Sequence, residues 1–182
     1  MRSGLPSWAQ VTPARLAHVE RVVALITTWA DGIHLDPLER ERWIRAAWLH
    51  DALRDAPEEE LRRLVPNEPG LTELLHGPAA AVRAVADGEE DAGVLSAVRW
   101  HSVGSAHWDR VGQALYCADF LEPGRSFERD ARAELAARFP TAMDGVVRDV
   151  AARRVTWLVR SGWFIPETTW RFWNHVAGGR PM

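Results

Sequence analysis

Hydrophobic residues recur three or four positions apart along most of the chain, which is the spacing of an amphipathic helix. Between residues 13 and 30, Val19, Val22 and Ile26 follow this spacing, and Pro13 suits the first turn of a helix. Alternation of polar and apolar residues, which indicates a half-buried strand, does not persist over any length of the sequence. The pattern therefore predicts an all-α fold, a bundle of helices around one core.

Prolines, glycines and capping residues divide the chain into its helices. Pro78 is expected to interrupt or restart the first turn of a helix at residues 73–86. Residues 1–12 are expected to form a loose lead-in, residues 13–177 a single domain and residues 178–182 a C-terminal tail. The further predicted helices are one from residue 37 that residues 55–57 break, a short one starting at Pro57, and those at residues 91–101, 108–120, 129–139, 143–160 and 168–176.

The composition is that of a soluble globular protein, with 47% hydrophobic and 26% charged residues in a chain of 182. The formal net charge is −3, so the chain lacks the basic excess that is typical of nucleic-acid-binding proteins. The single cysteine, Cys117, excludes an internal disulfide and fits a reducing compartment. No apolar run approaches the roughly 18 residues of a membrane helix, and no signal peptide is recognisable. We therefore expect a cytoplasmic protein that binds neither nucleic acid nor membranes.

The candidate chemistry begins at residues 43–51, an apolar helical stretch that ends in His50 and Asp51. A buried imidazole needs a partner, and a buried carboxylate is costly unless it is paired or binds a metal. His18 and Asp119 lie on or beside the apolar faces of two other predicted helices, so all four side chains can converge in a bundle. A lone core histidine is more often a hydrogen-bond partner, but the ordered set is more specific. Two imidazoles and two carboxylates suit divalent iron, manganese, cobalt or zinc.

Four segments resemble those of a known enzyme family. Residues 115–125 (LYCADFLEPGR) resemble the ADYIEPGR segment of the bacterial HD-type symmetrical diadenosine tetraphosphate hydrolases, which belong to the HD-domain superfamily of metal-dependent phosphohydrolases. Residues 101–104 (HSVG) are similar to its His-Thr-x-Gly, and residues 75–78 (LHGP) to its Leu-His-Gly. Residues 165–168 (IPET), followed by Asn174, resemble its C-terminal segment.

The resemblance implies a bundle of helices around one metal centre, often iron, with a nucleoside diphosphate in the pocket. Arg54 stands where the family commonly has Lys, and Ser102 where it commonly has Thr. The residues implied as metal ligands are His18, His50, Asp51 and Asp119, and those implied at the phosphates and nucleotide are Arg15, Arg54, His76, His101, Ser102 and Arg125.

Chain spacing supports the role of the arginines, because each lies close in sequence to an implied ligand. Arg15 precedes His18 by one helical turn, and Arg125 follows the turn after Asp119. Guanidinium groups at these positions suit bidentate contacts to phosphate. Arg125 is also a candidate catalytic residue.

His76 and His101 leave several roles open, because they could bind phosphate, protonate a leaving oxygen or hold a second metal ion. We favour the phosphate and acid roles, since the sequence offers no dedicated extra carboxylate for a second ion. His34 is expected in a loop, and His107 and His175 at solvent-facing or structural positions.

These residues together predict a hydrolase that splits diadenosine tetraphosphate into two ADP molecules by means of a metal-activated water. Another HD-type phosphohydrolase, acting on a nucleoside monophosphate, a deoxynucleoside triphosphate or a cyclic nucleotide, is the first alternative. A metal- and nucleotide-binding sensor without turnover is the second. Ten tryptophans, several of them near the C-terminus, could also present an apolar patch for a homodimer.

Overall fold

A computed structural model describes residues 4–178, which contain nine α-helices, one short 3₁₀ helix and no strand. The all-α prediction is confirmed. Residues 1–3 and all but the first residue of the expected 178–182 tail lie outside the described residues. The elements are α1 (Pro13–Gly32), α2 (Pro37–Leu49), α3 (Glu58–Leu64), η1 (Thr72–Leu74), α4 (His76–Ala86), α5 (Ala92–Trp100), α6 (Arg110–Leu121), α7 (Arg129–Arg138), α8 (Met143–Arg160) and α9 (Glu167–Val176).

Side chains that accept hydrogen bonds from the first turn define where several helices begin. Thr12 accepts from the amide of Arg15 at the start of α1, and Asp36 accepts from the amides of Leu38 and Glu39 at the start of α2. Asp91 and Asp109 cap α5 and α6 in the same way. These caps satisfy amide groups that have no partner within the helix.

Two helix ends differ from the sequence prediction, and both differences concern histidines. The helix expected at residues 73–86 begins at His76, because Pro78 suits the first turn, and residues before it form η1. The helix expected to run to residues 55–57 ends at Leu49, and His50 follows as its C-terminal cap. His50 thus follows the C-terminal end of α2, where backbone carbonyl groups are free to accept hydrogen bonds, and His76 follows η1 closely.

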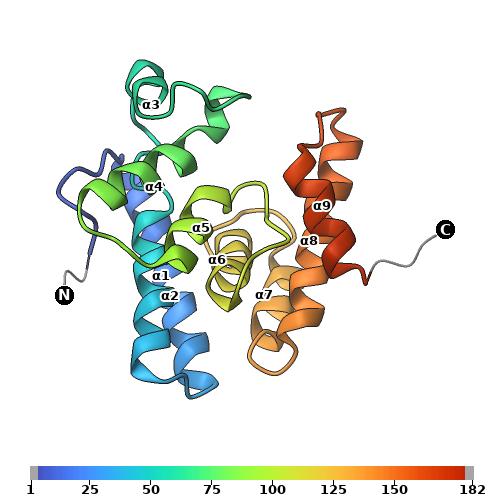
Figure 1. Ribbon diagram of the computed structural model, residues 1–182. Helices are drawn as coiled ribbons and strands as arrows, with labels where there is room; N and C mark the ends of the chain where they lie inside the picture. Colours follow the sequence, from blue (N-terminus) through green and yellow to red (C-terminus); the bar gives the residue numbers. More distant parts are fainter. Residues whose placement is uncertain (1–3, 179–182) are drawn as a thin grey trace.

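Helix α6 is the centre of the fold, packed against α1, α2, α5, α7 and α8 (Figure 1). Leu115, Tyr116, Cys117 and Ala118 on this helix are all buried in the main hydrophobic core. Asp119 follows them on the same helix and is also buried. The most enclosed helix therefore carries one of the candidate metal ligands into the interior.

The C-terminal part of the chain forms a pair of packed helices, α8 and α9, on one side of α6 (Figure 1). Phe172 on α9 reaches the core, where its ring contacts Trp108 and Tyr116. Trp163 and Phe164, in the connection between the two helices, are exposed. Of the tryptophans near the C-terminus, Trp157, Trp163 and Trp170 are exposed, and Trp173 is partly buried against the core.

Residues 4–12 form no helix, yet they are attached to the rest of the molecule. The amide of Gln10 donates to the carbonyl oxygen of Ala52 at 2.7 Å, and the Gln10 side chain contacts Glu60. Trp8 packs against both smaller apolar clusters of the core. Among the helices of residues 4–178, none is long and apolar enough to span a membrane.

Candidate metal centre and adjoining cleft

Four imidazoles surround the carboxylate of Asp51, two on each oxygen. The Nε2 atoms of His18 and His50 each lie 3.6 Å from Oδ2. The Nε2 atoms of His76 and His101 lie 3.3 and 3.4 Å from Oδ1. All five side chains are buried. The structure therefore brings together residues from four regions of the sequence around one carboxylate.

Each imidazole is oriented by a hydrogen bond at its other nitrogen. Nδ1 of His50 contacts the carbonyl oxygen of Ala47 at 2.7 Å, and Nδ1 of His101 contacts that of Val98 at 2.8 Å. Nδ1 of His76 contacts the carbonyl oxygen of Glu73 at 2.8 Å. Because a carbonyl oxygen can only accept, these nitrogens are donors, and Nε2 of a neutral ring then keeps a lone pair. Metal-binding histidines are commonly held in this way.

A glycine permits the approach of α4 to α5 that brings His76 and His101 together. A Cβ at Gly77 would lie 2.8 Å from the carbonyl oxygen of Arg99 and 2.9 Å from that of Val98. The two Nε2 atoms of the histidines are 3.0 Å apart. Any larger residue at position 77 would force the helices apart and separate the two imidazoles.

Asp119 completes the group from α6. Its Oδ1 lies 3.2 Å from Nε2 of His18. Within residues 4–178, two groups of side chains have ligand atoms close enough together to hold a metal ion. One is His18 with His50 and Asp51, and the other is Asp51 with His76 and His101. Asp119 belongs to neither group but borders the first. Asp51 is common to both, so one carboxylate serves two possible ion positions.

The donor atoms fit a divalent transition metal. Nε2 of His18 and Nε2 of His50 are buried and have no hydrogen-bond partner within residues 4–178. Buried nitrogens without partners are costly unless something binds them. The donors are imidazole nitrogens and carboxylate oxygens, and the one cysteine lies in the core with its pKa raised by burial. This set suits iron, manganese, cobalt or zinc in an open site.

The electrostatics at neutral pH favour a cation between these groups. Burial alone would raise the pKa of Asp51, but the neighbouring histidines hold it well below its usual range. Burial also lowers the pKa of His50 to about 4, which leaves a neutral imidazole. For His18, burial lowers the pKa, but the nearby carboxylates of Asp119 and Glu122 outweigh it and raise the pKa to about 9. A proton on His18 supplies positive charge when no cation is bound.

Glu122 orients His18 from behind, a role that the sequence did not reveal. Its Oε1 lies 3.2 Å from Nδ1 of His18, and its Oε2 accepts from Arg21 and from the amide of Gly124. Burial raises the pKa of Glu122, but these partners outweigh it and lower the pKa to about 2. The conspicuous Glu-Pro-Gly-Arg turn therefore contributes a carboxylate that fixes one candidate ligand.

The predicted arginines differ in how they are paired. Arg15 contacts Oδ2 of Asp51 at 2.9 Å, and Arg125 contacts Oδ1 of Asp119 at 2.8 Å. The Arg54 side chain makes no ion pair or hydrogen bond with the described part of the chain, and its charge helps burial to lower the pKa of His76. All three cations lie beside the candidate centre.

Arg154, on α8, is a fourth cation at the centre and was not predicted. Its Nη2 donates to Oδ2 of Asp119 at 2.8 Å, and its guanidinium lies over the ring of Tyr116. Its other amino group contacts the carbonyl oxygen of Ser102 at 3.3 Å. Arg154 is one of many arginines in a helical segment of mixed charge, so no local signal distinguished it.

Ser102 lies beside the paired histidines, with its hydroxyl 3.1 Å from Nε2 of His101. His107 and His175 are exposed and distant from these contacts, and His34 lies in a loop with a positive φ of 52°. The site therefore gathers the predicted set and leaves these three histidines outside it.

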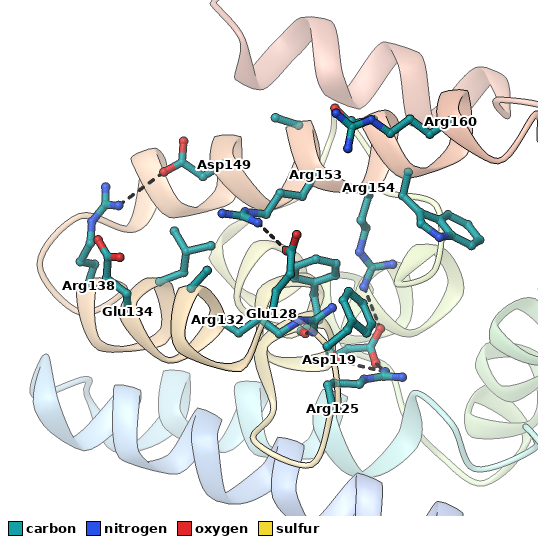
Figure 2. A pocket seen from close by; sticks show the side chains of 17 residues that line it. Asp119, Arg125, Glu128, Arg132, Glu134, Arg138, Asp149, Arg153, Arg154 and Arg160 are labelled. Atoms are coloured by element: carbon teal, nitrogen blue, oxygen red, sulfur yellow. Dashed lines mark hydrogen bonds and ion pairs between the residues drawn. The ribbon is translucent and has the colours of Figure 1, made fainter.

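A cleft with a volume of ≈ 850 Å³ opens next to Asp119 between the 120–128 segment, α7 and α8. Figure 2 shows Asp119 at one end of this cleft, in contact with Arg125 and Arg154. Six arginines and four acidic residues line it. The arginines are Arg125, Arg132, Arg138, Arg153, Arg154 and Arg160.

Comparison with known proteins agrees with this geometry. The HD domain family matches residues 15–138. The symmetrical bis(5'-nucleosyl)-tetraphosphatase of Halalkalibacterium halodurans is 24% identical over 165 residues, which cover 86% of this chain and 87% of that protein. The protein of the same name from Bacillus subtilis is 28% identical over 126 residues, covering 65% and 66% of the two chains.

A solved structure from Clostridium acetobutylicum has the same fold. It is described as a predicted HD superfamily hydrolase involved in NAD metabolism, and it superposes with a TM-score of 0.82. The alignment covers 93% of this chain and 92% of that chain at 23% identity. The arrangement of helices around the centre is therefore shared with a protein of quite different sequence.

Proposed function

Because this chain belongs to the HD domain family, we propose that it is a hydrolase that cleaves a dinucleoside tetraphosphate. The cleavage is symmetrical and gives two nucleoside diphosphates. Diadenosine tetraphosphate is the substrate that we expect first. The observation that carries this proposal is the set of four imidazole Nε2 atoms around the two oxygens of Asp51. The family resemblance read from the motifs is confirmed. The curated relatives with this name support the choice of substrate.

His18, His50, Asp51 and Asp119 would hold the metal ion, for which iron is our first expectation. A divalent metal supplies Lewis-acid activation of water and neutralises charge on a phosphoryl group. The chain contributes the orientation of these ligands, through Glu122 behind His18 and the carbonyl oxygen behind His50. The ligands are thus held in place before the substrate arrives.

Arginines around the centre match the charge of the substrate, because a tetraphosphate carries several negative charges that must be compensated in the site. Arg15, Arg125 and Arg154 already contact carboxylates of the centre, whereas Arg54 forms no ion pair within residues 4–178. We assign Arg54 to a phosphate for that reason. Arg125 is assigned to the central phosphates, since its Nη2 lies 2.8 Å from Oδ1 of Asp119.

The reaction forms a bond from the oxygen of water to one central phosphorus and breaks the bond from that phosphorus to the central bridging oxygen. The bridging oxygen leaves with the other nucleoside diphosphate and needs a proton. His76 and His101 suit this task, because their Nδ1 atoms donate to carbonyl oxygens and a hydrogen bond between their Nε2 atoms requires a shared proton. Ser102 lies within reach of both imidazoles.

The same two histidines are also placed to hold a second ion together with Asp51. The sequence offered no dedicated carboxylate for that ion, but the structure shows that Asp51 presents its second oxygen to them. The number of metal ions bound per chain separates the two roles.

Product analysis tests the proposed reaction. Purified protein is incubated with diadenosine tetraphosphate and ferrous iron, manganese, cobalt or zinc, and the nucleotides are separated by ion-exchange chromatography. We expect ADP as the only nucleotide product. Formation of ATP and AMP would contradict symmetrical cleavage, and the lack of turnover with every metal would contradict the enzyme assignment. Parallel assays with nucleoside monophosphates, deoxynucleoside triphosphates and cyclic nucleotides test the other reactions known for this kind of domain.

A further inference from the structure

Two hollows open beside the candidate metal centre, and Arg125 lines both of them. The first is the cleft of ≈ 850 Å³, which reaches Asp119. The second is a small hollow of ≈ 240 Å³, lined by the start of α1 and the turn after α6, which reaches His18. A ligand that is cut at the centre would therefore extend into both hollows.

The cleft contains a buried cation that forms no ion pair in the described part of the chain. The guanidinium of Arg132 donates to the carbonyl oxygen of Phe120, and the carboxylates of Glu128 and Asp119 act on it only from beyond ion-pair distance. Arg132 is 3% exposed and makes no ion pair with a carboxylate in residues 4–178. Its guanidinium lies 4.0 Å from the ring of Phe120 and 3.9 Å from that of Phe127, and its Nε has no hydrogen-bond partner in this part of the chain. Burying an unpaired charge is costly. A phosphate group in the cleft would supply the missing negative charge.

The cleft also presents aromatic rings that the core does not cover. Trp157 is 57% exposed and Phe127 is 54% exposed, although both line this hollow. Trp157 lies one helical turn beyond Arg153 and Arg154 on α8, so the cations come first and the indole follows along the same side of the helix. A nucleoside diphosphate has the same order, with its phosphates followed by a base that stacks on an aromatic ring.

The small hollow differs from the cleft in its volume and in the residues that line it. Arg15, Arg21 and Arg125 line it, and no aromatic ring other than the imidazole of His18 does so. Its volume lies below the roughly 300–1,000 Å³ of pockets that enclose small molecules. It can accept phosphates but cannot enclose a nucleoside.

We infer that the symmetrical substrate is bound asymmetrically, with one nucleoside diphosphate half in the cleft and its base against Trp157, and with only the phosphates of the other half in the small hollow. This inference rests on the proposed function. Arg132 is assigned to a phosphate of the enclosed half. The second nucleoside extends outside the small hollow and contributes little to recognition.

The asymmetry predicts how the enzyme treats a substrate with only one nucleoside. Adenosine 5'-tetraphosphate can place its adenosine in the cleft, and water then cleaves it at the same central bond into ADP and pyrophosphate. We expect kcat/KM for this compound within about tenfold of that for diadenosine tetraphosphate, because only one base is enclosed. A loss of more than about a hundredfold would show that both nucleosides are recognised and would overturn the inference.

A pair of tryptophan variants tests the position of the base. Trp157→Ala should raise KM about tenfold for both compounds, since stacking on the indole is lost. The control is Trp170→Ala, which removes a partly exposed tryptophan on α9 that does not line either hollow, and it should leave KM unchanged. An unchanged KM in Trp157→Ala would contradict the assignment of the cleft to the nucleoside.

Ligand binding without turnover separates a failure of this inference from a failure of the proposed reaction. Calorimetry should show that Trp157→Ala weakens ADP about tenfold and leaves pyrophosphate unchanged. Arg132→Gln, checked for its helical circular dichroism, should weaken both ligands, because both place a phosphate near it. If diadenosine tetraphosphate is not cleaved but these binding differences remain, only the proposed reaction fails. Equal weakening of ADP and pyrophosphate by Trp157→Ala would indicate a structural effect and overturn the inference.

Discussion

The guanidinium of Arg154 donates to Oδ2 of Asp119 across 2.8 Å and thereby joins α8 to α6 at the candidate metal centre. Arg125 takes the other carboxylate oxygen of Asp119, also at 2.8 Å. Burial would raise the pKa of Asp119, but His18 and these two arginines hold it well below its usual range. Since the HD domain match ends at residue 138, the helix that carries Arg154 contributes to the site from outside the matched region.

Replacement of Arg154 by Met should remove this support and leave Asp119 with Arg125 as its only arginine partner in residues 4–178. We expect kcat to fall about a hundredfold, because a displaced ligand moves the reacting groups apart. The free energy of unfolding should fall by about 1–3 kcal/mol, because one oxygen of the buried Asp119 carboxylate loses its hydrogen-bond partner. Steady-state kinetics and urea denaturation measure the two effects.

The control for this variant is Arg148→Met on the same helix, because Arg148 is exposed. It should change neither kcat nor stability by a measurable amount. If Arg154→Met kept full activity, the contact with Asp119 would have no role in the reaction.

His50→Ala should abolish metal retention and activity together. His50 is buried with an unpartnered Nε2 that faces Asp51, so no neighbouring group can replace it. We expect the affinity for ferrous iron to fall by more than about a hundredfold, which is more than the loss of a residue behind a ligand causes. Elemental analysis after gel filtration measures bound metal, and His107→Ala, which changes an exposed histidine, serves as control. Normal iron content in His50→Ala would refute its assignment as a ligand.

His101→Ala tests the two roles of the histidine pair. Its activity should fall by about 10²–10⁴-fold, the contribution typical of an acid or base in the site. If the pair acts on phosphate and the leaving oxygen, wild type and variant should each bind one ion. If the pair holds a second ion with Asp51, the stoichiometry should fall from two ions to one. Metal titration measures the number of ions bound per chain. Full activity in the variant would contradict both roles.

Glu122→Gln should show a pH-dependent loss of stability. The pKa of Glu122 is lowered to about 2 from an ordinary value of 4.5, so its carboxylate stabilises the folded chain fully above pH 4.5. This contribution is lost as the pH falls from 4.5 through 2. The difference in unfolding free energy between wild type and variant should therefore be largest at pH 7 and should shrink at pH 3.

This comparison is made by urea denaturation in the presence of a chelator, so that metal release does not contribute. The same variant should bind metal about 10–100-fold more weakly at pH 7, because His18 loses the carboxylate that orients it. A stability difference that stayed constant between pH 7 and pH 3 would show that the charge of Glu122 is not its source.

Local sequence was enough to predict the all-α fold and most of the candidate residues. Helix α8 was expected at residues 143–160 and has those bounds, because helical spacing acts within one turn of the chain. His18, His50 and Asp119 could be selected because each is a polar residue on or beside an apolar face, which is an anomaly visible in one helix at a time. The bounds were less certain at residues 49–57 and 73–76, where the chain turns into the site.

The contacts between distant helices could not be predicted from the local sequence, because they depend on which face of one helix meets another. Examples are the contact of Glu122 with His18, the contact of Arg154 with Asp119, and the burial of Arg132. The division of Asp51 between two pairs of histidines has the same origin, because the approach of α4 to α5 at Gly77 places the second pair on its free oxygen. Helical periodicity specifies that a side chain points inward, whereas the partner it meets there is set by the packing of segments far apart in the chain.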